Sequence, residues 1–161
     1  MKLSIERSAL LKAVSQAQSV VERRNTIPIL ANVLIEAERE HVLFRATDLD
    51  IEVLDKAIAQ IEQTGATTVS ATTLHEIVRK LPEGSLVTLN NNPTKGRLTV
   101  EAGRSIFSLA TLPKEDFPVM ANSEYAANFS APTTLLRRLF DKSKFAISTE
   151  ETRYYLNGVY M

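Results

Sequence analysis

The chain of 161 residues contains no cysteine and no tryptophan, and it has only two histidines and five glycines. The absence of cysteine excludes a disulfide framework, a thiolate zinc site and a cysteine nucleophile. His41 and His75 leave little material for a histidine metal cluster, and the glycines lack the spacing of a phosphate-binding loop. No apolar run is long enough to cross a bilayer, and the first residues mix charge into apolar positions, unlike a secretory signal. These absences favour a cytoplasmic protein without a metal or other cofactor.

The composition is that of a globular protein with balanced charge. Hydrophobic residues make up 44% of the chain and charged residues 24%, and 19 basic residues offset 19 acidic ones. This length suits one domain, or one domain and part of another. A neutral total does not exclude nucleic-acid binding, because the distribution of charge decides that.

The residue pattern predicts one sequence of elements, a strand, a helix and several strands, that begins three times. Leu3 and Ile5 alternate with polar residues as in a half-buried strand, and Ser8 opens a helical pattern that fades near Val20. The predicted strands cover residues 3–5, 27–35, 41–46, 51–61, 67–70, 86–89, 98–101, 105–110, 128–131 and 153–161. The predicted helices cover residues 8–21, 71–81 and 133–142, and residues 112–119 are expected to form an extended linker.

Counting supports this repeat. Each predicted strand anchor precedes two apolar helix residues by five and nine positions, and the anchors lie 64 and 62 residues apart: Ile5, Leu10, Val14; Val69, Leu74, Val78; Ala131, Leu136, Phe140. Residues 30–35 also resemble residues 156–161 at an offset of 126. The predicted fold is α+β, with two helices packed on one face of antiparallel sheet in each domain. We expect a complete domain over residues 1–120 and the start of another over 121–161, so that the chain is the N-terminal part of a longer protein.

An acidic row is a candidate metal site. Asp48, Asp50 and Glu52 would share one face of a strand because their spacing is two, and carboxylate oxygens bind divalent cations. The alternative, which we favour, is a solvated strand face opposite buried Leu49 and Ile51. The sequence also has no Gly-x-Ser-x-Gly motif and no implied pair of nucleophile and base, so we expect no catalytic residues.

Basic residues gather on the predicted helices and on one loop. They are Lys12, Arg23, Arg24, Arg79, Lys80, Arg137, Arg138, Lys142 and Lys144. If the helices line a common surface, these cations would present a positive face to phosphate and give sequence-independent contact. An ordinary solvated helix surface explains the same pattern equally well.

Ordered motifs over essentially the whole chain resemble the bacterial DNA polymerase III beta subunit, the replicative sliding clamp. They are MKLSIERSALLKAV at residues 1–14, NTIPIL at 25–30, ATDLDIEV at 46–53, GATTV at 65–69, LPEG at 81–84, FSLATLP at 107–113, DFP at 116–118 and RYYLNG at 153–158. The resemblance implies a subunit of three domains that dimerises head to tail into a ring around duplex DNA. It would tether the polymerase without catalysing a reaction, and its partners would include the polymerase catalytic subunit and the clamp loader. A protein-interaction scaffold without a DNA role is the rival interpretation.

The resemblance also implies roles for individual residues. Arg24, Tyr154 and Tyr155 match DNA-contacting positions, and Lys12, Arg137 and Arg138 would add helix cations. Phe107, Leu109 and Ile77 match the apolar side of the dimer interface. Residues 105–110 would form an exposed edge strand with apolar side chains. Leu156 matches one wall of the pocket that captures partner peptides. Thr72, Thr73 and Glu150 stand where family members often have basic or amide residues, which would weaken contact with phosphate.

Overall fold

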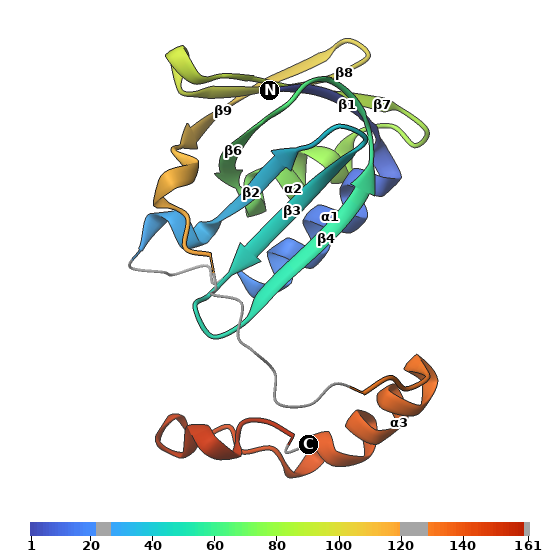
Figure 1. Cartoon of the computed structure of the whole chain (residues 1–161), viewed down its shortest axis with the longest axis vertical. Helices are drawn as coiled ribbons and strands as arrows, with labels where there is room; N and C mark the ends of the chain where they lie inside the picture. The colour runs from blue at the N-terminus through green and yellow to red at the C-terminus, as the bar shows by residue number, and fades with distance from the viewer. Residues whose placement is uncertain (22–26, 120–128, 160–161) are drawn as a thin grey trace. The chain divides into compact units, whose positions relative to one another are not determined.

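The computed structural model describes residues 1–21, 27–119 and 129–159, apart from the side chains of Glu151 and Tyr154. The chain separates into two compact units, Met1–Ala121 and Asn122–Met161 (Figure 1). Each unit is described by itself below.

The first unit repeats one order of elements. Its first half comprises β1 (Lys2–Glu6), α1 (Arg7–Val20), the 3₁₀ turn η1 (Pro28–Ala31), β2 (Asn32–Ala37), β3 (His41–Thr47), β4 (Glu52–Ile58) and β5 (Gln60–Gln63). Its second half comprises β6 (Gly65–Ser70), α2 (Ala71–Lys80), β7 (Leu86–Asn92), η2 (Pro93–Lys95), β8 (Arg97–Ala102), β9 (Ser105–Leu112) and η3 (Lys114–Asp116).

The two halves exchange their first strands. The antiparallel strands are ordered β4-β3-β2-β6-β9-β8-β7-β1-β5, so β1 pairs with β7 of the other half and β6 pairs with β2. Strand β9 runs beside β8 and then crosses to β6 at Thr111 and Leu112. Strand β4 runs beside β3, and its continuation β5 crosses to β1. The two halves therefore have the same order of elements, as the counted repeat predicts, and the first strand of each half pairs with the other half.

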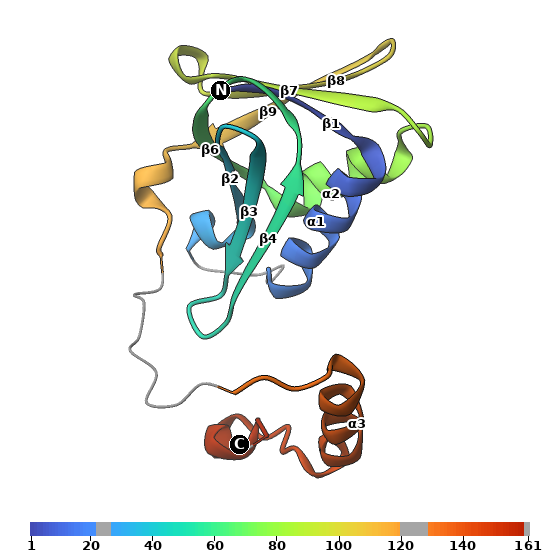
Figure 2. The same cartoon turned by 45° about the vertical axis from the view of Figure 1, so that its right-hand side comes forward.

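Both helices of the first unit cover one side of the sheet. In Figure 1, α1 and α2 lie side by side behind β2, β3 and β4, and Figure 2 shows both helices on the same side of these strands. Leu10 and Val14 of α1 are fully buried, as are Leu74 and Val78 at the matching positions of α2. This arrangement confirms the predicted α+β fold, because the repeated apolar spacing is what joins each helix to the core.

Three local predictions for the first unit are wrong. Residues 28–31 form a 3₁₀ turn rather than a strand, since Pro28 has a fixed φ and no N–H for a sheet ladder. Residues 51–61 form two strands with different partners instead of one strand. Residues 112–119 are not simply an extended linker: β9 extends to Leu112, η3 follows, and Phe117 is buried in a small cluster with Leu30 and Leu34.

The second unit consists of helical segments in its described part. Helix α3 spans Thr133–Ser143 and is followed by η4 (Lys144–Ala146) and η5 (Glu151–Leu156). No strand occurs within residues 129–159, so the strands predicted at 128–131 and 153–161 are wrong over those residues, and Asn128, Tyr160 and Met161 lie outside them. A strand needs a hydrogen-bonded neighbour, and residues 129–159 contain no strand to provide one.

Candidate nucleic-acid and assembly surfaces

The exposed face of α1 carries little charge. Lys12 is exposed, and its exposed neighbours along the helix are neutral serine and glutamine residues. Ser15 and Ser19 donate hydrogen bonds to backbone oxygens of their own helix, to Leu11 O at 2.6 Å and to Gln16 O at 2.7 Å. Arg79 and Lys80 are exposed at the end of α2, and Arg23 and Arg24 lie outside the described residues. The first unit therefore presents sparse cations on a polar helix surface.

Cations are denser on the second unit. Arg137 and Arg138 are exposed on α3, and Arg137 Nε lies 3.8 Å from Asp141 Oδ2. Glu150 forms an ion pair with Arg153 at 2.9 Å, so its carboxylate faces a cation within its own segment. The Tyr155 side chain is 71% exposed, and that of Tyr154 lies outside the described part. Leu156 is 45% exposed, and its backbone oxygen accepts a hydrogen bond from Ser148 N.

The structure brings two of the three predicted interface residues together. Phe107 of β9 and Ile77 of α2 face the same hollow of about 230 Å³. The hollow is lined by residues of α2, of the turn after α2 and of β9: Thr73, Glu76, Ile77, Lys80, Leu81, Pro82, Ser105 and Phe107. Leu109 is different, because it is only 7% exposed and belongs to the core. Leu109 thus contributes little exposed surface in this chain, and its place in the dimer interface stays a prediction.

One edge of β9 has no strand partner among the described residues over much of its length. Residues 105–110 pair with β8, whereas β6 pairs only with Thr111 and Leu112. Strand β4, at one end of the pairing order, is bonded only to β3 among the described strands. Ile106 and Phe107 are 69% and 37% exposed on the open part of β9. Open strand edges with apolar side chains recruit further strands.

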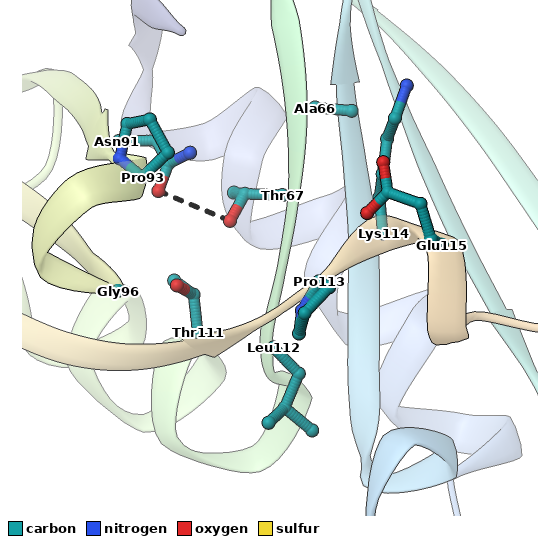
Figure 3. Close-up of a pocket in the computed structure, with 10 residues that line it drawn as sticks. All are labelled: Ala66, Thr67, Asn91, Pro93, Gly96, Thr111, Leu112, Pro113, Lys114 and Glu115. Atoms are coloured by element: carbon teal, nitrogen blue, oxygen red, sulfur yellow. Dashed lines mark hydrogen bonds between the residues drawn. The ribbon is translucent and has the colours of Figure 1, made fainter.

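A larger hollow of about 350 Å³ was not predicted from the sequence (Figure 3). Thr67 of β6 and Asn91 of β7 approach one another in it, with 3.3 Å between Thr67 Oγ1 and Asn91 Oδ1. Pro93 and Pro113 contribute apolar walls. Its lining residues come from segments far apart in the sequence, and no motif joins them, so sequence reasoning had no signal for this hollow.

The acidic row does not form the predicted strand face. Asp48 lies before β4, in a turn where its Oδ1 accepts hydrogen bonds from Asp50 N at 3.0 Å and Ile51 N at 2.7 Å. Leu49 has a φ of +84°, and Leu49 and Ile51 are 50% and 58% exposed rather than buried. Within the described ranges, no group of three or more His, Cys, Asp or Glu residues is placed to hold a metal ion.

Two titrating groups are shifted by local hydrogen bonds. The Ser8 side chain and backbone lower the pKa of the Glu6 carboxyl, which caps the start of α1. A hydrogen bond and ion pair with Glu62 raise the pKa of the Lys2 ammonium. Both groups are exposed and belong to the fold rather than to a reactive centre.

In the part of the chain that the structure describes, no helix has the length and apolar character needed to span a membrane.

Comparison with known families identifies the origin of this domain. A family model described as the DNA polymerase III beta subunit, N-terminal domain, matches residues 1–121. The chain belongs to this family. The beta sliding clamp of Caulobacter vibrioides is 56% identical over 161 residues, which cover 100% of this chain and 43% of the relative. The beta sliding clamp of Pseudomonas aeruginosa is 39% identical over 160 residues and is also covered to 43%.

Solved beta-subunit structures agree with the fold. A crystal structure of the DNA polymerase sliding clamp from Caulobacter crescentus matches with a TM-score of 0.94 at 56% identity, covering 99% of this chain and 43% of the other. A sliding clamp from Bartonella birtlesii bound to griselimycin matches with a TM-score of 0.94 at 46% identity, covering 99% of this chain and 42% of the other. This beta-subunit chain thus spans less than half the length of the relatives it matches.

Proposed function

We propose that this chain provides the first domain, over residues 1–120, and the beginning of the second, over 121–161, of a sliding clamp. The whole protein would encircle duplex DNA and tether the replicative polymerase by topology, without catalysis. Its partners would be DNA of any sequence, the polymerase III catalytic subunit and the clamp loader, and it would act in the cytoplasm. The observation that carries this proposal is the match to beta sliding clamps along the entire chain at 56% identity.

The open edges of the first unit support a ring built head to tail. Strands β4 and β9 occupy equivalent places in the two halves, and each has an edge without a strand partner among the described residues. The side chains at the two edges differ, so the β4 edge and the β9 edge are two different surfaces. A contact between different surfaces generates a ring when its rotation closes. Phe107 and Ile77 would supply apolar contact beside the β9 edge of a head-to-tail homodimer.

The DNA-facing residues would act on phosphate rather than on bases. Lys12 of α1 and Arg137 and Arg138 of α3 are exposed cations, and the resemblance adds Arg24, Tyr154 and Tyr155. The neutral serine and glutamine surface of α1 would allow sliding, because it offers no fixed set of strong contacts. Leu156 would form one wall of a partner-peptide pocket whose other walls lie in the remaining sequence.

Retention on circular DNA tests the topological function. The full-length protein would be loaded by a clamp loader onto nicked circular DNA and then challenged with high salt. We expect it to remain on circles and to leave when the DNA is linearised, because a closed ring slides off free ends. Equal retention on both forms would contradict encirclement, and no retention on circles would favour the scaffold interpretation.

The 161-residue chain alone should bind DNA weakly. Without a ring, only direct contacts between its cations and phosphates remain, so we expect a dissociation constant on the order of 10⁻⁴ M or weaker at physiological salt. Fluorescence anisotropy with labelled duplexes of two unrelated sequences measures this binding. Tight binding that is insensitive to salt would contradict the proposed mode of contact.

A further inference from the structure

One arginine joins the start of α1 to the end of α2. Arg7 Nε donates a hydrogen bond to Val78 O at 3.1 Å, and Arg7 Nη2 donates another to Arg79 O at 2.8 Å. The backbone N–H of Arg7 donates to Ser85 O at 2.9 Å, just beyond the turn that follows α2. A single residue thus holds three backbone oxygens of the segment that ends α2.

Two of these oxygens, Val78 O and Arg79 O, belong to the last turn of α2. The last carbonyls of a helix have no partner within the helix, and a nearby cation also interacts favourably with the helix dipole. Helix α2 ends at Lys80, and Leu81 N supplies a longer bond of 3.3 Å to Val78 O. The Arg7 guanidinium therefore fixes the position of the last turn of α2.

The repeat shows that the fold itself does not require this arginine. The equivalent position in the second half, 64 residues further on, is Ala71, which is fully buried and has no side-chain donor. Ala71 has no guanidinium, and the second half still folds in the same way; within residues 1–21 and 27–119 no arginine side chain bonds the end of α1 as Arg7 bonds the end of α2. This asymmetry indicates that Arg7 has a role specific to the end of α2.

The end of α2 lines the hollow beside the open edge of β9. Ile77, Lys80 and Leu81 face this hollow, and Phe107 faces it from β9. We propose that Arg7 is a positioning residue for subunit assembly: it holds the last turn of α2 so that this turn and Phe107 form a preshaped receiving surface. The proposal rests on the proposed ring function, in which this surface contacts the other subunit.

Arginine suits this role better than lysine. Its planar guanidinium presents several donors in a fixed geometry and can hold two neighbouring carbonyls at once, whereas an ammonium is a single flexible point charge. Arg7→Lys should therefore preserve the favourable charge at the helix end but lose part of the positional constraint.

Local hydrogen exchange in the 161-residue chain provides the first test. In Arg7→Met we expect faster exchange of the amides near the end of α2, Leu81 included, and unchanged exchange of Val42 in β3. Arg7→Lys should give a smaller increase, and Arg39→Met in the exposed β2–β3 turn is the matched control. Equal acceleration throughout the first unit would mean a general structural role and would overturn the proposal.

Dimerisation of the full-length protein provides the second test. We expect Arg7→Met to weaken the dimer about tenfold, the scale of one lost hydrogen bond to a charged group, as measured by sedimentation. In an Ile77→Ala background the same change should have less effect, because both residues act through one surface. If the wild type dimerises and Arg7→Met dimerises equally well, the role of Arg7 is overturned. If the wild type itself stays monomeric, the proposed ring fails, and this role fails with it.

Discussion

The two units of this chain contain similar helices in different surroundings. In α2, Leu74 and Val78 are fully buried, whereas Phe140, at the matching place of α3, is 42% exposed. No residue of α3 is buried, and Phe129 and Phe145 are 70% and 87% exposed. The difference shows that an apolar pattern is sufficient for a helix to be built but not for a core, which needs strands from elsewhere in the sequence.

The largest contrast should come from truncating one phenylalanine in each unit. Phe44 is 1% exposed in the core of the first unit, so Phe44→Ala should lower the free energy of unfolding by about 3–5 kcal/mol. Phe145→Ala should leave that unfolding transition unchanged. Urea denaturation followed by circular dichroism measures both, and equal losses in the two variants would refute the assignment of the core to the first unit.

Two linked hydrogen bonds through the buried Thr68 side chain, called the Thr68 relay here, should give the next largest effect. Asn32 Nδ2 donates to Thr68 Oγ1 at 3.0 Å, and Thr68 Oγ1 donates to Leu112 O at 2.9 Å, where β9 crosses to β6. Thr68→Val retains the shape but leaves two polar groups without this partner. We expect a loss of about 1–3 kcal/mol by the same denaturation. Exposed Thr134→Val on α3 is the control, and an unchanged Thr68→Val variant would show that the relay is not stabilising.

A small, pH-dependent effect is expected at the start of α1. The Glu6 carboxylate accepts hydrogen bonds from Ser8 N and Ala9 N, and its pKa lies below the ordinary value of 4.5. Its stabilisation is therefore present above about pH 4.5 and is lost as the pH falls through the lower pKa of the folded state. Glu6→Gln should slightly lower the Tm near neutral pH, and the difference should shrink in acid. A difference that grows in acid would contradict this assignment.

The smallest effect should follow removal of the second unit. Since Met1–Ala121 forms a compact unit with its own core, a chain ending at Ala121 should unfold with the same midpoint as the whole chain. Only the helical signal of residues 133–143 should disappear. Thermal unfolding of both chains measures this, and a clearly lower midpoint in the shorter chain would show that the second unit stabilises the first.

Sequence reasoning was most successful where the relevant contacts repeat. The spacing of Ile5, Leu10 and Val14 predicted the fold of the first unit, because the same spacing recurs 64 residues later and both copies are buried. It did not give the burial of Leu109, since alternation along β9 gives the face of a side chain but not its depth. Leu109 lies opposite fully buried Leu98 of β8, and this neighbour sets its burial.

Other features depended on contacts that no local pattern contains. The strands predicted in the second unit need partners that are not within its described residues. Phe117 occupies a cluster with Ile29 and Leu30, nearly ninety positions earlier in the chain, so its segment looked like a linker. The hollow of Figure 3 is likewise assembled from separate strands. The position of the candidate interface was predictable only through family resemblance.

The open edges of β4 and β9 have a consequence for how such proteins evolve. A strand edge offers the same ladder of N–H and C=O groups whether the next strand arrives in the same polypeptide or in another. Two neighbouring units can then be joined through the same strand edges whether they belong to one polypeptide or to two separate chains. Duplication or division of the gene could therefore change how many polypeptides complete a closed assembly without changing the strand pairing between neighbouring units.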